Sequence, residues 1–278
     1  KLDKTSNSKS EKTKKYLFRL LDNNLIETVS MIEGEKHTVC ISSQVGCNVG
    51  CTFCATATMG FIRNLSTGEI LEQLDYVRNN INERITNVVF MGMGEPFLNY
   101  KNVIKAADIF NSKEGYGLGA NRITISTAGI LPKIKDFINN KIKYKLAISL
   151  NASNNLTRSE IMPINKTWNI NDVILFLKNN NSLKKNIMFE YVLLKNINDS
   201  IEDACRLAKL LNGIKCKLNI IPYNEIQGEY TRPDENTIEV FIKTLIKKQK
   251  TNSFIVLVRW SKGQDIDAGC GQLAILNK

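Results

Sequence analysis

The sequence predicts an α/β protein, built as a partial (β/α)6 barrel with an N-terminal β-hairpin. Three observations predict this fold: apolar runs of four to eight residues recur along the chain, helix-like segments separate them, and 278 residues suffice for one such domain with a substantial core. Short apolar runs between helices are typical of parallel strands that are buried on both faces. Periodicity alone leaves an open sheet as the alternative.

The N-terminal part of the chain differs from the rest in composition. Residues 1–15, KLDKTSNSKSEKTKK, contain almost no apolar side chains, and we expect them to form a basic, disordered arm. Residues 16–36 contain two strand-like runs around Asp22, Asn23 and Asn24, which predicts a β-hairpin extension. Residues 37–278 show no break in composition and are expected to form one core domain.

The elements of the core follow in regular order. The first barrel strand is expected over 38–42 and leads directly into a cysteine-rich loop. Ser66 and Glu69 form a capping-box pattern before a helix that is predicted over 70–81. Further strands are predicted over 85–91, 122–127, 144–150, 186–194, 216–222 and 254–260, and helices over 102–110, 132–139, 171–179, 201–211 and 235–248. Loops at the carboxyl ends of parallel strands carry the chemistry in such folds, so we expect the cysteine loop there.

Three cysteines stand close together in the string GCNVGCTFC: Cys47, Cys51 and Cys54. Cys47 and Cys51 are at most about 14 Å apart when the chain is fully extended, so a folded loop brings all three sulfurs within reach of one cluster. Three thiolates on a four-iron cluster leave one iron open to a small molecule. A structural zinc site is the alternative, but it needs four protein ligands, and the only histidine, His37, precedes the triplet. The pattern favours an iron–sulfur cluster.

The charge of the chain indicates the kind of partner. Lys and Arg number 38 against 27 Asp and Glu, a net charge of +11, which favours a polyanion, nucleic acid before membrane. A lysine-rich composition without function is the alternative. The sequence has neither a signal peptide nor an apolar run of about eighteen residues, and seven cysteines fit a reducing compartment. We therefore expect a cytoplasmic protein without a membrane partner.

Several strings together resemble the RlmN/Cfr family of radical S-adenosylmethionine (SAM) RNA adenine methyltransferases. They are CISSQVGC, GFIRNL, FMGMGEP, ISTAGILP, LAISLN, NIIPYN and GQDIDAGCGQL, and the resemblance runs from about residue 15 almost to residue 278. Phe53, directly before the last cysteine of the triplet, also fits the superfamily signature. The resemblance implies a TIM-like radical SAM barrel and one 4Fe-4S cluster on Cys47, Cys51 and Cys54. It also implies two SAM molecules per turnover, one as methyl donor and one as radical source. Family members typically carry a further N-terminal helical domain, which this chain does not match.

The resemblance also implies roles for individual residues. Cys270 corresponds to the cysteine that carries the methyl group, and Cys40 to the one that releases the enzyme–RNA adduct by forming a disulfide. Glu27 resembles a family acid/base position, and Gly269 stands where alanine is usual. Asn151 stands where histidine is usual among the positions expected to contact SAM, which are Gly94, Glu95, Ser126, Ser149, Leu150, Asn151 and Asn224. Cys205 and Cys216 match no motif and are expected to be packing residues.

The function that the resemblance implies is methylation of carbon 2 of adenine 2503 in 23S rRNA and of adenine 37 in tRNA. The expected partners are these RNAs and an electron donor such as flavodoxin or ferredoxin, and the protein is expected to be a monomer. Methylation at carbon 8 is the nearest alternative, although MGMGEP, with Pro96, favours the carbon-2 group. A glycyl-radical activase would use the cysteine triplet without needing Cys40 and Cys270 as a pair. An iron–sulfur RNA-binding protein without SAM chemistry is the non-enzymatic alternative.

Overall fold

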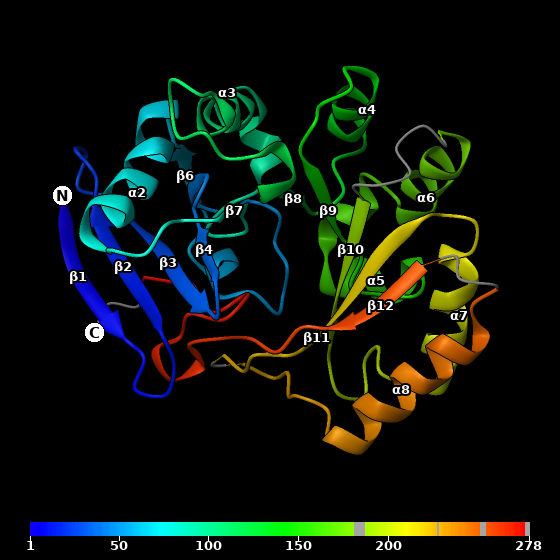
Figure 1. Ribbon diagram of the computed structural model, residues 1–278. Coiled ribbons are helices and arrows are strands. Elements are labelled where there is room, and N and C mark those ends of the chain that lie inside the picture. Colours follow the sequence, from blue (N-terminus) through cyan, green and yellow to red (C-terminus); the bar gives the residue numbers. More distant parts are fainter. Residues whose placement is uncertain (181–186, 227, 251–253, 276–278) are drawn as a thin grey trace.

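The computed structural model describes residues 1–180, 187–226, 228–250 and 254–275 (Figure 1). Its main feature is a ten-stranded sheet in the order β1-β2-β3-β4-β7-β8-β9-β10-β11-β12. The first four strands pair antiparallel, and the strands from β4 to β12 pair parallel. The strands are β1 Leu2–Asn7, β2 Thr13–Arg19, β3 Leu25–Glu33, β4 Lys36–Cys40, β7 Asn87–Phe90, β8 Ile123–Thr127, β9 Lys145–Ser149, β10 Ile187–Leu193, β11 Cys216–Pro222 and β12 Phe254–Val258.

Helices connect successive parallel strands and flank the curved sheet on its outer side (Figure 1). They are α2 Thr67–Asn80, α3 Tyr100–Asn111, α4 Leu131–Asn139, α6 Ile170–Asn179, α7 Ile201–Leu211 and α8 Glu235–Lys248. This makes six β/α units and a closing strand in a sheet that does not close on itself, which confirms the predicted partial (β/α)6 barrel. No helix in the described part of the chain is long and apolar enough to cross a membrane.

The sequence located most of these elements to within a few residues. The capping box is present as predicted: Ser66 Oγ accepts from Glu69 N at 3.2 Å, and Glu69 Oε2 accepts from Ser66 N at 2.8 Å. It starts α2 at Thr67, three residues before the predicted boundary. The first barrel strand ends at Cys40 rather than at residue 42. Residue 186 of the strand predicted over 186–194, and residues 276–278 of the predicted core, lie outside the described residues.

Four short elements were missed, because none has the apolar periodicity that the prediction used. They are the helices α1 Ala55–Thr58 and α5 Asn155–Ile161, and the strands β5 Gln44–Gly46 and β6 Phe61–Asn64, which pair antiparallel. The N-cap of α5 is Asn154, whose side chain accepts from Thr157 N at 2.9 Å.

The expectation of a disordered arm over residues 1–15 is wrong. Residues Leu2–Asn7 form an edge strand, β1, which pairs antiparallel with β2. The polar side chains of β1 are mostly exposed, as suits an edge strand, where lysines discourage pairing with other chains. The turn after β1 is fixed to the C-terminal part of the chain: Lys9 N donates to Asp265 Oδ2 at 2.9 Å, and Gly263 N donates to Glu11 Oε2 at 2.8 Å. These partners are distant in sequence, so local composition did not reveal them.

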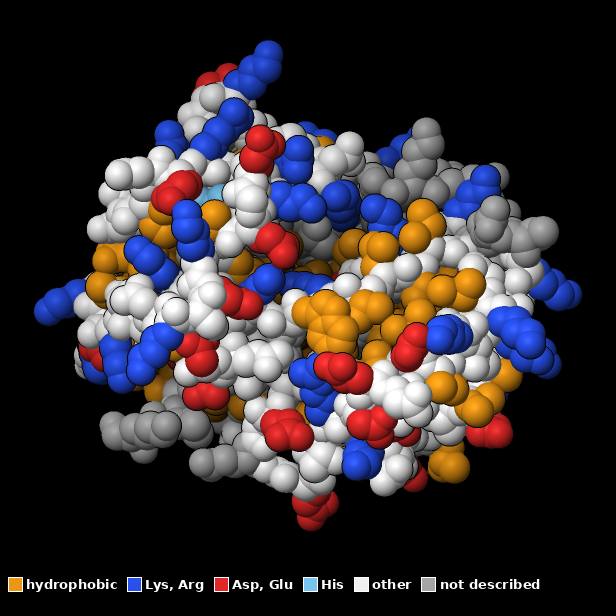
Figure 2. Space-filling view, turned by 60° about the horizontal axis from the view of Figure 1, so that its bottom comes forward, with side chains coloured by type: hydrophobic (Ala, Val, Ile, Leu, Met, Phe, Trp, Pro, Cys, Tyr) orange, Lys and Arg blue, Asp and Glu red, His pale blue; other side chains and the backbone are white. Residues whose placement is uncertain are grey.

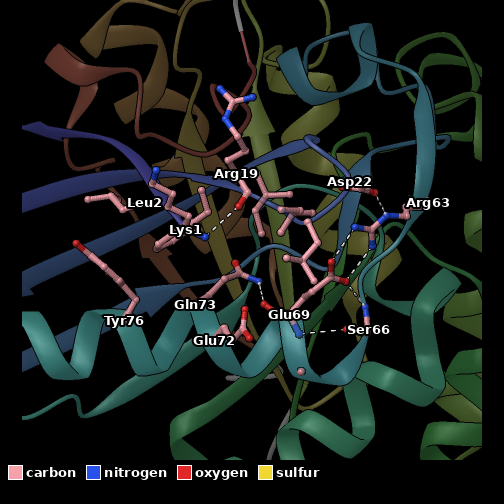
Figure 3. A pocket seen from close by; sticks show the side chains of 15 residues that line it. Lys1, Leu2, Arg19, Asp22, Arg63, Ser66, Glu69, Glu72, Gln73 and Tyr76 are labelled. Atoms are coloured by element: carbon pink, nitrogen blue, oxygen red, sulfur yellow. Dashed lines mark hydrogen bonds and ion pairs between the residues drawn. The ribbon is translucent and has the colours of Figure 1, made fainter.

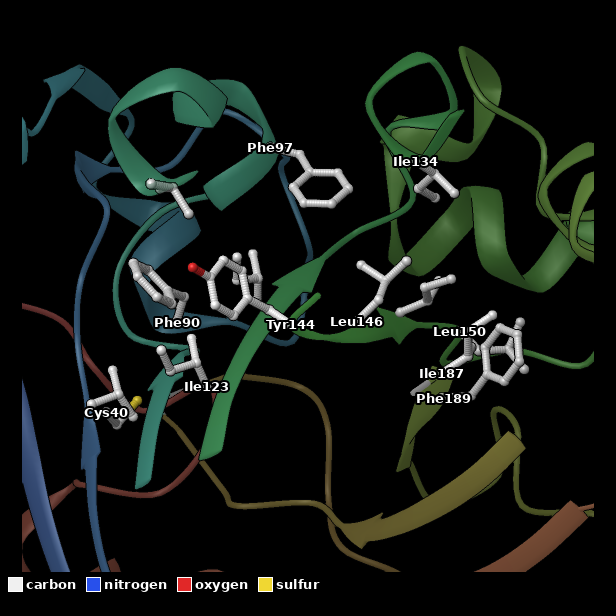
Figure 4. Close-up of a cluster of buried hydrophobic side chains, with 14 of the residues drawn as sticks. Cys40, Phe90, Phe97, Ile123, Ile134, Tyr144, Leu146, Leu150, Ile187 and Phe189 are labelled. Atoms are coloured by element: carbon white, nitrogen blue, oxygen red, sulfur yellow. The ribbon is translucent and has the colours of Figure 1, made fainter. Parts of the chain in front are cut away.

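The main core lies between the parallel strands and the helices (Figure 4). Neighbouring strands contribute Phe90, Ile123, Leu146 and Phe189, all buried, and Ile134 of α4 packs against the same cluster. Burying each such side chain stabilises the fold by about 1.5–3 kcal/mol. Because successive side chains of a strand point to opposite faces, the residues that alternate with this core face the other side of the sheet. The candidate site is built on that other side.

Candidate active site

A cavity of about 160 Å³ opens at the carboxyl ends of the parallel strands. Ser126, Ser149 and Glu190 line it from β8, β9 and β10, as the alternation with the buried core predicts. The predicted cofactor residues that line it are Cys47, Cys51, Cys54, Gly94, Glu95, Ser126, Ser149 and Asn151, and Cys270 lies in the same wall. One cavity thus brings together the cysteine triplet, most of the predicted SAM contacts and the predicted methyl carrier.

The cysteine loop is held in place by close backbone contacts. A Cβ at Gly46, whose φ is +71°, would lie 1.8 Å from Gly60 O, so only glycine fits there. Cys47 N donates to that carbonyl of Gly60 at 2.8 Å, and Ala55 N donates to Gly271 O at 2.7 Å. The second bond joins the cysteine loop to the segment that carries Cys270.

The three thiols suit an iron–sulfur cluster. Burial raises the pKa of Cys47 to about 12, and burial together with repulsion from Cys54 and Cys47 raises the pKa of Cys51. The thiolates that iron requires are therefore stable only when a cationic group lies between them. Within the described ranges, no three or more His, Cys, Asp or Glu side chains converge on a point where one metal ion could bind.

An apolar shell surrounds the cysteine loop. Val49, Phe53, Met162 and Tyr223 are buried and pack as one small cluster, against which Cys47 and Cys51 lie. Such a shell limits the access of water and controls the reduction potential of a bound cluster.

Gly94 and Glu95 form one wall of the cavity. The φ of Gly94 is +97°, and a Cβ there would lie 2.5 Å from the Cβ of Gln44. Glu95 Oε2 accepts from Ala128 N at 2.6 Å, and Glu95 Oε1 accepts from Phe97 N at 2.9 Å. Burial raises the pKa of Glu95 to about 7, although these hydrogen bonds oppose the shift. A buried carboxylate fixed in this way is suited to a cationic ligand group such as the ammonium of SAM.

Asn151 lines the cavity and has an unusual backbone conformation. Its φ is +55°, which asparagine tolerates better than most residues do. Its Oδ1 accepts from Val192 N at 2.9 Å, and its Nδ2 donates to Met162 Sδ, a weak acceptor, at 3.3 Å. Asn151 Nδ2 donates no second hydrogen bond to the described residues, so its other amide hydrogen is available to a ligand.

Arg158 holds the ends of two strands, and sequence reasoning did not single it out. Its side chain is fully buried and donates to the carbonyls of Leu150, Ser149 and Ala128 at 2.6–2.9 Å. A buried arginine that bonds three carbonyls holds the ends of β8 and β9 in fixed relative positions. Arg158 lies on α5, a helix that the sequence analysis did not predict, so its role was not predicted either.

Two of the expected SAM contacts do not line the cavity. The side chain of Leu150 belongs to the main core, and its backbone N donates to Glu190 O at 2.9 Å. The side chain of Asn224 instead donates to Ser261 Oγ at 2.8 Å and to Cys270 O at 2.9 Å. Asn224 thus supports the loop of the methyl carrier.

Glu27 also lies outside the cavities that the cysteines line. It is buried on β3, and its Oε1 forms an ion pair with Lys15 Nζ at 3.0 Å, while Oε2 has no hydrogen-bond partner. Burial raises the pKa of Glu27, and Lys15 opposes this shift. Glu27 is not among the residues that line the cavity of Cys40 and Cys270.

Cys40 and Cys270 share a second, smaller cavity of about 50 Å³. Cys40 is the last residue of β4, and Cys270 lies on the C-terminal loop and lines both cavities. Burial, and then the proximity of Cys270, raises the pKa of Cys40 to about 12. All seven cysteines are free thiols in this structure. A group carried by Cys270 would therefore lie between the cluster cysteines and Cys40.

Arg259 and Glu190 are two charged residues of this site that sequence reasoning missed. Arg259 lines both cavities, and its Nη1 lies 4.0 Å from Glu190 Oε2 and donates to Met91 Sδ at 3.6 Å. Glu190 Oε1 accepts from Asn219 Nδ2 at 2.8 Å, whereas Oε2 has no hydrogen-bond partner. The signal was present in the sequence, because each charge interrupts a run of apolar strand residues, FEYVL and VLVRW.

Another cavity lies apart from the cysteines. A groove of about 890 Å³ lies between the N-terminal strands and α2, and it contains no cysteine (Figure 3). Several of its charged groups are paired: Arg63 bonds Asp22 at 2.5 Å and Glu69 at 2.7 Å, and the Lys1 amine donates to Arg19 O at 3.0 Å. Figure 2 shows Lys and Arg side chains spread widely over one face of the molecule, with hydrophobic side chains gathered beside a hollow.

Comparison with known proteins gives consistent results. Residues 41–208 match the radical SAM superfamily, whose members use SAM and a 4Fe-4S cluster. The chain is 48% identical to the dual-specificity RNA methyltransferase RlmN of Lawsonia intracellularis, over 97% of this chain and 77% of that protein. It is 46% identical to the probable dual-specificity RNA methyltransferase RlmN of Clostridium botulinum, over 96% of this chain and 76% of that protein.

A solved structure supports the same assignment. The crystal structure of a radical SAM methyltransferase from Sphaerobacter thermophilus superposes with a TM-score of 0.91 at 38% identity, covering 98% of this chain and 80% of that one. The cysteine triplet, the carboxyl-end cavity and these relatives agree. The chain belongs to the radical SAM superfamily and, within it, to the RlmN family of dual-specificity RNA methyltransferases.

Proposed function

We propose that this chain methylates carbon 2 of adenine in RNA, with adenine 2503 of 23S rRNA and adenine 37 of tRNA as its substrates. One observation carries the proposal: Cys270 lines both the cavity of the cysteine triplet and the cavity of Cys40. An enzyme that only cleaves SAM has no need for such a second thiol pair, so this arrangement favours methylation over the activation of a glycyl radical.

Cys47, Cys51 and Cys54 would hold the cluster, and Glu95, Ser126, Ser149 and Asn151 would hold SAM beside it. When bound, the cluster supplies the electron that cleaves SAM reductively and so provides the radical source. The chain itself orients SAM, with the carboxylate of Glu95 available to the ammonium group. The buried shell of Val49, Phe53, Met162 and Tyr223 keeps water away from this reaction.

Cys270 is the proposed methyl carrier. Its thiol loses a proton, and the sulfur attacks the methyl carbon of one SAM, so that a carbon–sulfur bond to Cys270 forms as the methyl–sulfonium bond breaks and S-adenosylhomocysteine leaves. Arg259 lines the cavities of both thiols, so a guanidinium lies beside the sulfur that makes this attack. The methyl carbon, after losing a hydrogen atom to the radical source, would add to the adenine ring, and the resulting adduct radical would pass one electron to the oxidised cluster.

Cys40 is the proposed resolving thiol. Its thiolate attacks the sulfur of Cys270, a disulfide forms, and the bond between that sulfur and the transferred carbon breaks. The electron pair of the broken bond passes to that carbon, which takes up a proton to become the new methyl group. The shared 50 Å³ cavity supports this step, because the two sulfurs must meet directly.

The ring carbon must also lose a proton to a base. Glu27 is proposed for this on the resemblance alone, since its carboxyl lies beside Lys15 and outside both cavities. Glu190, which lines the first cavity and whose Oε2 accepts no hydrogen bond from the described residues, is the second candidate. Comparing Glu27→Gln with Glu190→Gln separates them, because only loss of the true base should stop turnover after the RNA adduct has formed.

The proposed partners are RNA and a small electron-transfer protein such as flavodoxin or ferredoxin, acting on a monomer. The experiment that tests the function is expression in a bacterial strain that lacks its own enzyme, followed by mass spectrometry of nucleosides from purified 23S rRNA and tRNA. We expect 2-methyladenosine in both. Finding 8-methyladenosine would establish the carbon-8 alternative, and finding neither, from a cluster-loaded protein, would contradict methylation of these RNAs.

A further inference from the structure

Trp260 is a large aromatic side chain in an unusual position. It follows β12, and it is 49% exposed although it lines the cavity that contains Cys40 and Cys270. An indole ring usually buries its apolar surface, so an exposed one beside a reactive site indicates a surface that is covered by a ligand.

The ring is held by a cation from another part of the chain. The guanidinium carbon of Arg232, in the segment before α8, lies 5.0 Å from the centroid of the Trp260 ring. Arg232 N in turn donates to Glu225 Oε1 at 3.1 Å. A cation–π contact of this kind fixes the orientation of the indole and leaves the rest of its surface accessible.

Trp260 is also fixed relative to the methyl carrier. Its neighbour Ser261 accepts from Asn224 Nδ2 at 2.8 Å, and the same amide donates to Cys270 O at 2.9 Å. On the other side of Trp260 in the sequence, the backbone N of Arg259 donates to Ile220 O of β11 at 2.9 Å. The indole is therefore positioned from both sides within the framework that positions Cys270.

The surroundings favour a nucleobase as the occupant. Arg259 and Lys262, on either side of Trp260 in the sequence, line the same cavity. Lys262 Nζ lies 3.5–3.6 Å from carboxylates of Glu11 and Glu33, and Arg259 Nη1 lies 4.0 Å from Glu190 Oε2, so each cation has an acidic partner within the chain. Unpaired RNA bases stack on aromatic rings and on guanidinium planes, and nearby cations bind the phosphates.

We propose that Trp260, supported by Arg232, stacks against an unpaired base of the RNA substrate next to the adenine that receives the methyl group. This inference rests on the proposed function and specifies how the substrate is positioned. Trp260 is a positioning residue: it aligns the RNA with Cys270 and takes no part in breaking or forming bonds.

The test uses fluorescence, since the chain contains only two tryptophans. Trp168→Phe leaves Trp260 as the single tryptophan of the cluster-loaded protein. Titration with a short RNA hairpin that presents the target adenine in its loop should quench this fluorescence. In the same background, Trp260→Ala should weaken RNA binding about 5–150-fold, as expected for the loss of one stacked base, and raise the KM for RNA. Trp260→Tyr should restore most of the affinity, because a tyrosine ring also stacks.

The matched control is Leu257→Ala, which removes an exposed apolar side chain of β12, the strand before Trp260, outside the cavity of Trp260. It should leave RNA affinity unchanged.

Unquenched fluorescence, or RNA affinity of Trp260→Ala within twofold of its parent, overturns the proposal. Quenching by an electron-transfer protein and not by RNA would also overturn it. If Trp260→Ala fails to fold, the proposal is still tested by the fluorescence titration of the single-tryptophan protein and by the RNA affinity of Trp260→Tyr. RNA that the parent neither binds nor methylates would mark failure of the proposed function itself.

Discussion

The side-chain amide of Asn224 donates to the backbone carbonyl of Cys270 at 2.9 Å. Because Asn224 lies two residues after the end of β11, this bond connects the sheet to the loop of the methyl carrier. Gly269 permits the contact: a Cβ there would lie 2.9 Å from Asn224 Cγ and 2.7 Å from Gln272 Oε1. An alanine at this position would therefore require the side chains of Asn224 and Gln272 to shift.

Replacing Asn224 by Asp should slow the methylation of Cys270 without weakening the binding of SAM. The carboxylate cannot donate to Cys270 O or Ser261 Oγ, so we expect a loss of stability of about 1–3 kcal/mol and slower methylation of Cys270. Affinity for SAM should change less than twofold, since Asn224 does not line the cofactor cavity. Denaturant unfolding, mass spectrometry of Cys270 and calorimetry with SAM check the three outcomes. A large loss of SAM affinity would instead support the direct contact that the resemblance implies.

The cysteine triplet should be required as a unit. Anaerobic reconstitution should give about four irons and four sulfides per chain. Cys47→Ala, Cys51→Ala or Cys54→Ala should each abolish SAM cleavage, because each variant lacks one of the three thiolate ligands. Cys205→Ala is the control and should retain both cluster and cleavage, since Cys205 lies on α7 away from the cavity. Stoichiometric zinc without iron–sulfide absorption in the wild type would contradict the assignment.

Variants that lack Cys40 or Cys270 should fail at different steps of the methylation reaction. Cys270→Ala should give neither methylated protein nor RNA adduct, because the carbon has no carrier. Cys40→Ala should still be methylated but should accumulate covalently joined protein and RNA, since no second sulfur can release the product. Denaturing gels should show a nuclease-sensitive slow band for Cys40→Ala that disappears in the double variant. Full RNA methylation by Cys40→Ala without this band would argue against a two-thiol mechanism.

SAM binding should depend on pH through Glu95. Burial raises the pKa of Glu95 to about 7, so in the empty site the carboxyl becomes protonated below that pH and loses its attraction for an ammonium group. We expect SAM affinity to be constant well above pH 7 and to fall about tenfold per pH unit below it. The same raised pKa means that stability contributed by neutral Glu95 is present at low pH and lost as the pH rises through about 7. Calorimetry with SAM at pH 6, 7 and 8 checks the binding, and Glu95→Gln should remove the dependence.

The lysines of the N-terminal strands should contribute to RNA binding. Lys9 and Lys15 lie on segments that bond Asp265 and Asp267, in the loop that leads to Cys270, so the basic strands border the site. Neutralising exposed Lys4, Lys12 and Lys14 should weaken RNA binding, and each lost phosphate contact should reduce the log–log salt slope by about 0.7–0.9. SAM cleavage without RNA should persist. Affinity that stays constant between 50 and 200 mM salt would show that the positive charge is a matter of composition alone.

Local interactions determined what the sequence could predict. The start of α2 follows from Ser66 and Glu69, which are three residues apart, and α7 and α8 lie at their predicted boundaries because their caps and apolar spacing are local. The cysteine triplet is equally local, since a loop of eight residues brings its thiols to one cavity.

Only the tertiary structure decided the rest, because the contacts concerned join residues far apart in the chain. The polar segment Leu2–Asn7 becomes a strand through its pairing with β2 and through the contact of Lys9 with Asp265. Cys40, at the end of β4, meets Cys270 of the C-terminal loop, and Arg259, directly after β12, meets Glu190 of β10, two strands away in the sheet. Burial and charge at these meeting points depend on every element packed around them, which no short stretch of sequence encodes.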